Sequence, residues 1–279
     1  MLGIIRPLRR LFGPAIGRWV FRSSSNNALP LEVDGHQMVL ATEGKYPPLN
    51  MALDRYEPAT TRLMKGLLGP DMTVVDIGAH VGYYSLLAAS RVGPTGTVYS
   101  FEPEPGNYGL LVRNLDLNGY KNVVTVNKAL SSRPGPVPFF LTSLDSGRHS
   151  VYSHGLPDGG RIEVEAATLD EFFQTEGWPS IDLVKIDVEG AEATVLDGMS
   201  GLLEKSPGLK MIIEFNPALL QSAGVAPLEF LQRLSSKGWR AHLIDETNGQ
   251  PPRLPDDTSS LVDRLVASGN SANLFCTRE

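Results

Sequence analysis

Short runs of apolar, often β-branched residues alternate along the chain with longer segments in which apolar residues recur every three or four positions. The short runs predict strands, at residues 73–77, 97–101, 123–127, 181–186, 210–215, 239–244 and 273–277. The longer segments predict helices, at residues 58–68, 83–91, 107–118, 169–174, 191–199 and 227–236. Strands that alternate with helices indicate an α/β protein whose mainly parallel, seven-stranded sheet carries helices on both faces.

Two further patterns fall outside this alternation. Residues 137–141 and 162–166 predict an added antiparallel pair of strands. Asp34 and Gly35 are a turn signal, which predicts a small hairpin or loop region within residues 31–50.

The first 30 residues have a composition of their own. They carry five arginines and no acidic residue, and their apolar residues fall at helical spacing interrupted by Pro7 and Pro14. Three readings stay open for this segment: peripheral contact of residues 1–22 with a membrane, packing of a helix on the domain or on a second copy in a homodimer, or disorder. No run approaches the roughly 20 apolar residues of a transmembrane helix, and no secretory cleavage site follows. We therefore divide the chain into a basic segment, 1–30, and a domain, 31–279, and expect a cytoplasmic protein, at the inner membrane face if it touches membrane.

Charge and cysteine content narrow the range of partners. The net charge is −6, and the five arginines of the first 30 residues leave −11 on the remainder. An acidic body argues against a general nucleic-acid binder and suits a small-molecule or glycan partner. The single cysteine, Cys276, excludes an intrachain disulfide, and no Cys/His cluster indicates structural zinc.

A glycine-rich turn follows the first strand of the predicted sheet. An apolar run ends at Asp76, and Gly78 and Gly82 follow in a G-x-x-x-G spacing at the start of a helix. Glycine has no Cβ, so such a turn lets the backbone approach a ligand closely. The spacing differs from the G-x-G-x-x-G that cradles a pyrophosphate, which argues against a nicotinamide oxidoreductase.

An acidic residue, Glu102, follows the second strand directly. A carboxylate about 20 residues beyond a glycine turn is the expected partner of two ribose hydroxyls, because its two oxygens can accept from both. The alternative is that Glu102 caps the helix that starts near Pro103 and Pro105. Asp76, Glu102, Asn127 and Asp187 all follow predicted strands, so the ligand site is expected over the carboxyl ends of the sheet.

Three sequence blocks together resemble the FkbM-type methyltransferases. They are Val75-Asp-Ile-Gly-Ala-His-Val-Gly-Tyr-Tyr84, Tyr99-Ser-Phe-Glu-Pro-Glu-Pro105 and Leu183-Val-Lys-Ile-Asp-Val-Glu-Gly-Ala-Glu192. The resemblance implies a Rossmann-like methyltransferase fold, with the last strand inserted antiparallel beside the strand at 210–215. It also implies S-adenosyl-L-methionine as the methyl donor and, as acceptor, a hydroxyl of a sugar, glycolipid or secondary metabolite. His80 stands where the family more often has asparagine, and it can still hydrogen-bond.

The resemblance also suggests which residues hold the donor. Gly78, Ala79 and Gly82 would leave space for its amino-acid end, and Asp76 would accept from its ammonium. Tyr83 or Tyr84 would face the sulfonium as a cation–π partner, or pack in the core. Asn127 and backbone groups would read the amino edge of the adenine. The remaining expected donor contacts are His80, Glu102, Pro103, Asn107, Ala129 and Leu130.

A hydroxyl acceptor requires a general base, because its proton must leave as the new bond forms. Asp187 and Glu189 are the main candidates, since residues two apart on an extended segment share a side. In the alternative reading, Asp187 binds the donor and Glu189 caps the next helix. His149 and His154, in the loop after the third strand, are further candidates. The residue spacing does not require a metal, so none is predicted.

The expected activity is therefore O-methylation. Two alternatives stay open at this point. One is an N-methyltransferase with the same donor, whose amine acceptor would need little base strength. The other is a donor-binding adaptor without catalysis.

Overall fold

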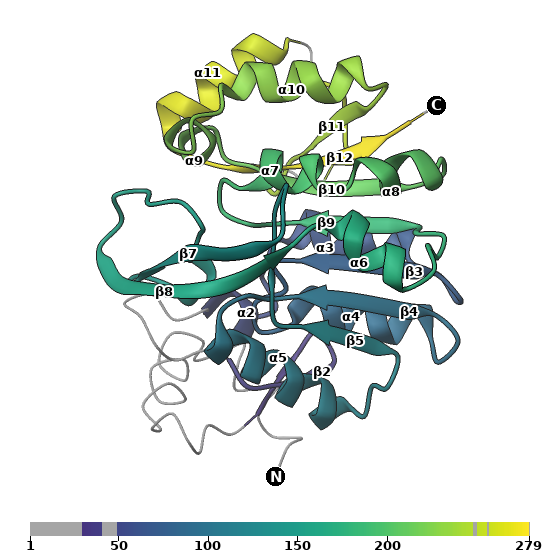
Figure 1. Cartoon of the computed structure of the whole chain (residues 1–279). Helices are drawn as coiled ribbons and strands as arrows, with labels where there is room; N and C mark the ends of the chain where they lie inside the picture. Colours follow the sequence, from purple (N-terminus) through teal and green to yellow (C-terminus); the bar gives the residue numbers. More distant parts are fainter. Residues whose placement is uncertain (1–29, 41–48, 248–249, 256, 279) are drawn as a thin grey trace.

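A seven-stranded sheet forms the centre of the protein in the computed structural model, which describes residues 30–40, 49–247, 250–255 and 257–278. The strand order is β11-β12-β10-β9-β3-β4-β5 (Figure 1). The strands are β3 (Thr73–Ile77), β4 (Thr97–Phe101), β5 (Val123–Val126), β9 (Leu183–Ile186), β10 (Lys210–Phe215), β11 (Arg240–Ile244) and β12 (Ala272–Thr277). All seven strands predicted from the apolar runs are therefore present.

The direction of the strands confirms the prediction of a mainly parallel sheet. β3 runs parallel to both β4 and β9, and β10 runs parallel to β9. β12 lies between β10 and β11 and is antiparallel to both, as the resemblance implied. The parallel strands therefore end at one edge, where their carboxyl ends can build a site.

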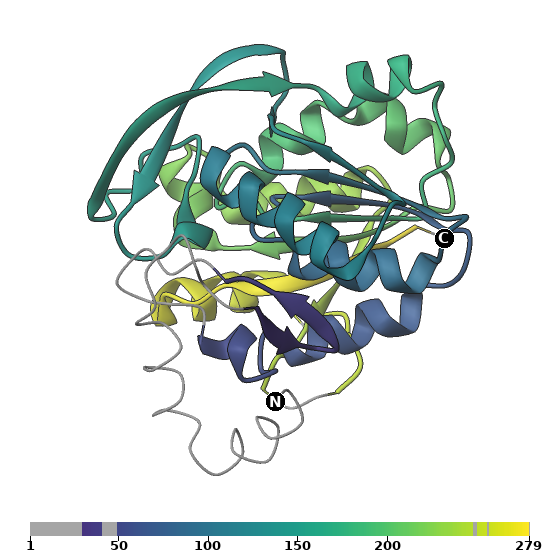
Figure 2. The same cartoon turned by 90° about the horizontal axis from the view of Figure 1, so that it is seen from below.

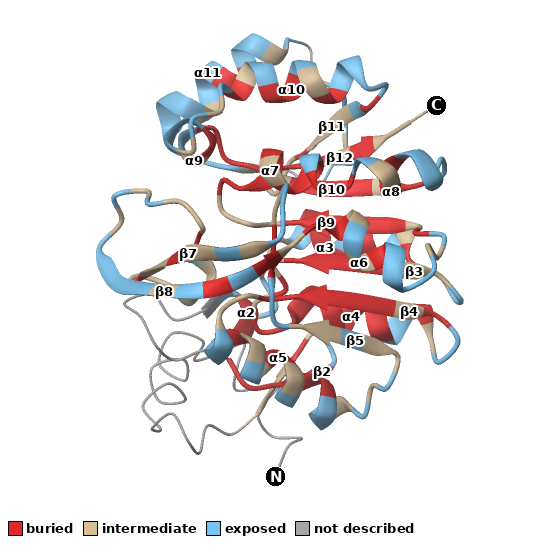
Figure 3. Cartoon of the chain, in the orientation of Figure 1, coloured by how far each residue is buried: buried red, intermediate tan, exposed pale blue. Residues whose placement is uncertain are grey.

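Helices cover both faces of this sheet (Figure 2). Successive residues of a strand point to opposite faces, so Val74 packs with α3 (Pro58–Leu67), α4 (Tyr83–Val92) and α5 (Pro105–Asn118). Val75 belongs to the other core, which includes residues of α6 (Leu169–Thr175), α7 (Glu192–Asp197), α8 (Ser200–Lys205) and α10 (Pro227–Ser236). The central strands are buried on both sides (Figure 3), which explains why their sequences are continuously apolar.

A second, three-stranded sheet stands beside the carboxyl ends of the main one (Figure 1, left). The expected antiparallel pair is β7 (Gly135–Thr142) and β8 (Asp158–Ala167), and β6 (Ala129–Leu130) joins it parallel to β8. The expected hairpin near the N-terminus is β1 (Leu31–Val33) and β2 (His36–Met38). Asp34 and Gly35 form its turn with φ angles of 48° and 88°.

Four helices were not predicted: α2 (Leu49–Ala52), α8, α9 (Pro217–Ser222) and α11 (Thr258–Ser268). Three of them span only four to six residues, too short to show a helical period. The expected N-terminal helix, and with it the membrane or dimer contact, lies outside the described residues. Among the described residues, no helix has the length and apolar character needed to cross a membrane.

Candidate active site

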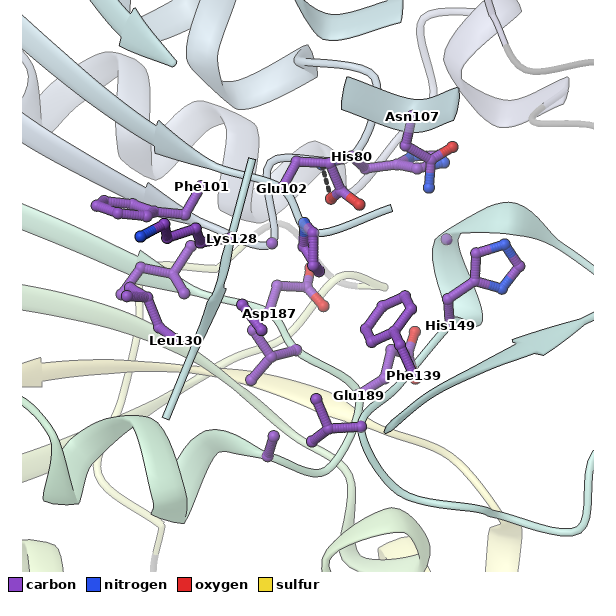
Figure 4. A pocket seen from close by; sticks show the side chains of 18 of the residues that line it. His80, Phe101, Glu102, Asn107, Lys128, Leu130, Phe139, His149, Asp187 and Glu189 are labelled. Atoms are coloured by element: carbon purple, nitrogen blue, oxygen red, sulfur yellow. Dashed lines mark hydrogen bonds between the residues drawn. The ribbon is translucent and has the colours of Figure 1, made fainter. Parts of the chain in front are cut away.

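A pocket opens over the carboxyl ends of β3, β4 and β9, beneath the second sheet. It encloses about 540 Å³ of unfilled space, including part open to solvent. Figure 4 shows Glu102, which follows β4, and Asp187, which follows β9 on the other side of β3, on its walls. The structure brings these predicted residues to this first pocket: Gly78, His80, Glu102, Pro103, Asn107, Ala129, Leu130, His149, Asp187 and Glu189.

The Glu102 carboxylate is held by two backbone amides. Its Oε2 accepts from the N–H of His80 at 2.8 Å, and its Oε1 accepts from the N–H of Glu104 at 3.0 Å. Burial raises the pKa of Glu102 to about 7, although both backbone bonds oppose the shift. Glu104, and not Glu102, caps α5, because its side chain accepts from the N–H of Asn107. The alternative reading of Glu102 as the helix cap is therefore wrong.

The glycine turn has two different functions along its length. Gly78 has a φ of 81°, and a Cβ there would lie 1.8 Å from the backbone oxygen of Asp187, so only glycine lets the two segments approach. A Cβ on Gly82 would instead lie 2.7 Å from Leu111 in α5. Gly82 thus serves helix packing, and the expectation that it leaves room for the donor is not supported.

His80 also lines this pocket. His80 adopts a left-handed backbone with φ 51°, and its Nε2 lies 2.8 Å from the Oγ of Ser146 in the loop after β7. Burial lowers the pKa of His80 to about 4, so the ring is neutral near pH 7. The ring thus links the glycine turn to the loop that borders the pocket.

Asn127 does not reach the pocket. Its side chain is exposed, and its Nδ2 donates to the backbone oxygens of Glu102 at 2.8 Å and Pro103 at 3.0 Å. Ala129 and Leu130 line the pocket instead, because they form β6 and pair with β8. The expectation that Asn127 reads the adenine is therefore wrong, and its role is to hold the segment that carries Glu102.

A second pocket continues from the first and shares Gly78, His80, Gly147, Asp187 and Glu189 with it. Its walls add three predicted donor contacts, Asp76, Ala79 and Tyr83. They also include Tyr84, the alternative to Tyr83 in the sequence prediction. The sequence reasoning missed five further lining residues: Met51, Tyr56, Glu57, Lys185 and Glu214. The two pockets therefore form one cleft, with Asp187 and Glu189 where they meet.

Lys185 is the one lysine on the wall of the second pocket, and its side chain is only 2% exposed. Its Nζ lies 2.6 Å from the Oδ2 of Asp187 and 4.6 Å from the centre of the Tyr84 ring. Burial opposes its charge, but the carboxylates around it, Asp187 first, outweigh burial and raise the pKa of Lys185. A lysine inside an apolar strand was the sequence signal for this residue, since such a charge needs partners. The Tyr84 ring therefore faces Lys185, a cation of the protein itself.

Asp76 is 3% exposed at the end of β3. Its Oδ2 accepts from the Oγ of Ser85 at 2.6 Å. Burial raises the pKa of Asp76, with the nearby charge of Lys185 opposing the shift. Its carboxylate borders the second pocket, where a cationic group of a ligand would neutralise it.

Glu189 differs from Asp187 in its electrostatic surroundings. Asp187 is ion-paired with Lys185, whereas burial and then the charge of Asp187 raise the pKa of Glu189 well above its usual range, with Arg148 opposing. Glu189 has a left-handed backbone with φ 51°, so the segment is not extended as predicted. Both carboxylates nevertheless line both pockets.

Glu192 takes the position at the start of α7 that the sequence reasoning offered to Glu189. Its Oε1 accepts from the backbone N–H groups of Gly190 at 3.1 Å and Val188 at 3.4 Å. The reading of Glu189 as the helix cap is therefore wrong, and the Glu189 carboxylate stays available to the cleft.

The two candidate histidines have hydrogen bonds that bear on their roles. His149 lines the first pocket, and its Nδ1 accepts from the N–H of Thr142 at 3.1 Å, which places the proton of the neutral ring on Nε2. Nε2 can therefore donate but not accept, which argues against His149 as the base. His154 lies in neither pocket of the cleft, and its Nε2 is 2.7 Å from the backbone oxygen of Glu189. It holds the Glu189 segment in place.

The sheet order, the glycine turn beside it and the buried glutamate after the second parallel strand define the class of S-adenosylmethionine-dependent methyltransferases. More narrowly, the chain belongs to the FkbM methyltransferase family. The family described as "Methyltransferase FkbM domain" matches residues 76–241. Apart from Val75, this range includes all three sequence blocks on which the resemblance rested.

The chain is also similar to curated methyltransferases, and some of their names state a substrate or the atom that is methylated. The chain is 27% identical over 182 residues to "Hexuronic acid methyltransferase AglP" of Haloferax volcanii, covering 65% of this chain and 69% of that protein. It is 30% identical over 155 residues to "Methyltransferase sdnD" of Sordaria araneosa, covering 45% and 60%. It is 28% identical over 151 residues to "2-O-methyltransferase NoeI" of Sinorhizobium fredii, covering 49% and 61%. The chain thus spans less than two thirds of the length of the last two relatives.

Proposed function

We propose that this methyltransferase transfers the methyl group to a hydroxyl oxygen of a sugar-containing acceptor, a glycan, a glycolipid or a glycosylated metabolite. The observation that carries the proposal is the position of the Glu189 carboxylate, half-buried where the two pockets meet. An ionised carboxylate in that position can take the proton of the acceptor hydroxyl, and the raised pKa of Glu189, caused first by burial, makes it a stronger base. The names of two relatives, a hexuronic acid methyltransferase and a 2-O-methyltransferase, support a sugar hydroxyl.

The donor fits the first pocket on the chemistry of its walls. Each oxygen of Glu102 accepts one backbone N–H and keeps a lone pair for one hydroxyl of a ribose diol. The apolar side chains of Ala129, Leu130 and Phe139 provide a surface for a flat base. When bound, S-adenosylmethionine supplies an electrophilic methyl group on a positively charged sulfur.

The residues of the chain mainly position the reacting groups. Gly78 and Asp187 bring two strand ends together, and the neutral His80 ring closes the site toward Ser146. Such positioning can contribute about 7–11 kcal/mol to catalysis in ideal cases. Glu189 receives the proton of the acceptor hydroxyl, while the ion pair with Lys185 holds the Asp187 carboxylate in place.

The test measures methyl transfer to a panel of neutral, acidic and amino sugars, with S-adenosylhomocysteine release as the readout and the methylated atom located by NMR. We expect an O-methyl product, and a fall in kcat of roughly 10²–10⁴-fold in Glu189→Gln, the usual contribution of a general base. The control is Glu165→Gln, which removes an exposed carboxylate on β8. An N-methyl product, or a Glu189→Gln enzyme of wild-type rate, would reject the proposal.

A further inference from the structure

The second pocket contains more negative charge than the donor can neutralise. Five carboxyl groups line it, those of Glu57, Asp76, Asp187, Glu189 and Glu214, against the single ammonium of Lys185. A bound S-adenosylmethionine, with one sulfonium, one ammonium and one carboxylate, would add a net charge of only +1. The remaining charge must be removed by protons or by a further cation.

Three of these carboxyl groups converge on one point. One oxygen each from Asp187, Glu189 and Glu214 lie within 4.8 Å of one another. They come from two elements, because Asp187 and Glu189 follow β9 whereas Glu214 lies in the neighbouring strand β10. Oxygens this close leave a position between them for an ion bonded at about 2.0–2.6 Å, the range of magnesium and calcium.

An independent observation concerns oxygens that lack a hydrogen-bond partner. Glu214 Oε2 is buried without one, and so is Oδ1 of Asn273, whose side chain is 4% exposed. Glu214 and Asn273 are directly opposed on the antiparallel strands β10 and β12, so their side chains share one face of the sheet. Leaving such an acceptor buried and unpaired costs about 1–3 kcal/mol. A cation beside Glu214 would satisfy its Oε2, and the unpaired Oδ1 of Asn273 belongs to the residue directly opposite on the same face of the sheet.

We propose that Asp187, Glu189 and Glu214, supported by Asn273, bind one hard divalent cation, magnesium, manganese or calcium. Carboxylate and amide oxygens are the ligands these ions prefer, and the donor set contains no sulfur or imidazole that would select zinc or copper. The sequence prediction of no metal is thereby revised. Glu214 lies far along the chain from Glu189, inside an apolar strand, so the residue spacing gave no signal for this cluster.

The function assigned to the cation rests on the proposed O-methylation. The cation binds the oxygen of the acceptor hydroxyl and lowers the pKa of that hydroxyl. The O–H bond breaks and its proton passes to the Glu189 oxygen that does not face the ion. The acceptor oxygen forms a bond to the methyl carbon, and the C–S bond breaks with its electron pair left on sulfur.

Terbium luminescence tests the site without any acceptor. Tyr56, Tyr83 and Tyr84 line the same pocket and can transfer excitation to a bound Tb³⁺ ion. We expect saturable one-site binding that Mn²⁺, Mg²⁺ or Ca²⁺ displaces, and a Tb³⁺ affinity at least about tenfold weaker in Glu214→Gln, in the range seen on altering metal-site partners. The matched control is Glu204→Gln, an exposed glutamate of α8, which should bind as the wild type.

A second variant covers the case in which Glu214→Gln does not fold. Asn273→Asp adds a fourth carboxylate beside Glu214 and should strengthen Tb³⁺ binding. Absence of saturable luminescence in the wild-type protein, or unchanged affinity in the variants, would overturn the proposal.

Methyl transfer in the presence of a chelator separates this proposal from the function on which it depends. We expect EDTA to abolish transfer and Mn²⁺ or Mg²⁺ to restore it. O-methylation at full rate in EDTA would overturn the proposed cation site and leave the proposed O-methylation standing. If the wild type binds Tb³⁺ and Glu214→Gln binds it more weakly, but no methyl group is transferred to any hydroxyl, the proposed function is overturned and the cation site is kept.

Discussion

The replacement Glu102→Gln tests how this protein binds the ribose of its methyl donor. Glu102 is 5% exposed, and each of its carboxylate oxygens already accepts one backbone N–H, from His80 and Glu104. Glutamine keeps one of these oxygens but turns an NH₂ group toward the other N–H. The variant therefore loses one backbone bond, the negative charge and the acceptor of one ribose hydroxyl.

The magnitude follows from these contacts. A hydrogen bond to a charged group contributes about 1.5–3 kcal/mol, and each 1.4 kcal/mol is about tenfold in affinity. We expect the Kd for S-adenosylhomocysteine to rise about 10- to 100-fold. Thermal stability should change less than affinity. The lost backbone bond is offset by removal of a buried carboxyl group, whose pKa of about 7 shows that its charge is disfavoured there.

Isothermal titration with S-adenosylhomocysteine measures the effect above and below pH 7. Ribose binding favours the ionised carboxylate, so wild-type affinity should rise as the pH increases through about 7, and the variant should lack this contribution. Glu104→Gln is the matched control. It removes the same charge only two residues away, and the Glu104 side chain does not line the pocket. Binding by Glu102→Gln as tight as that of the wild type above pH 7 would refute the reasoning.

Three further predictions concern the stability of the sheet ends and are all measurable by urea unfolding. Gly78→Ala places a Cβ 1.8 Å from a backbone oxygen after β9 and should destabilise the folded protein severely. The control Gly109→Ala, in open space on α5, should stabilise it by about 0.4–1 kcal/mol. Equal effects of the two substitutions on the free energy of unfolding would contradict the packing described. Lys185→Met leaves buried carboxylates unpaired and should cost about 3–5 kcal/mol, and a loss below 1 kcal/mol would count against the ion pair. In the donor-free protein Glu102 and Glu192 have pKa values of about 7, against 4.5 when unfolded, so the folded state binds more protons between these values. The lowered pKa of His80 acts in the opposite direction, so the test compares the wild type with Glu192→Gln, in which His80 is unchanged. The stability of the wild type relative to this variant should fall as the pH rises from about 4.5 to 7, and a constant difference would contradict the burial of Glu192.

The sheet and the ribose site could be predicted because their signals are local. Each buried strand is an apolar run, and the glycine turn and Glu102 each follow such a run within a few residues. Asn127 was misplaced because the chain turns again immediately after β5. Ala129 and Leu130 form β6, paired with residues of β8 that lie more than 30 positions later, and no local pattern carries that pairing.

The acidic half of the cleft depends on long-range contacts. Glu57, Lys185 and Glu214 come from the start of α3, from β9 and from β10, and only the folded sheet brings them to one pocket. In β9 and β10, a charged residue with apolar neighbours on both sides, Lys185 or Glu214, was the available signal. That signal indicates a charged side chain that needs a partner when it is buried, but it does not identify the partner.

The most direct test of the account is a crystal structure of the full chain with S-adenosylhomocysteine at saturating concentration. We expect the ribose hydroxyls on the Glu102 carboxylate, the base against Ala129 and Leu130, and the sulfur facing the junction where Asp187 and Glu189 meet. Electron density for the ligand elsewhere, or a ribose that leaves Glu102 uncontacted, would contradict it.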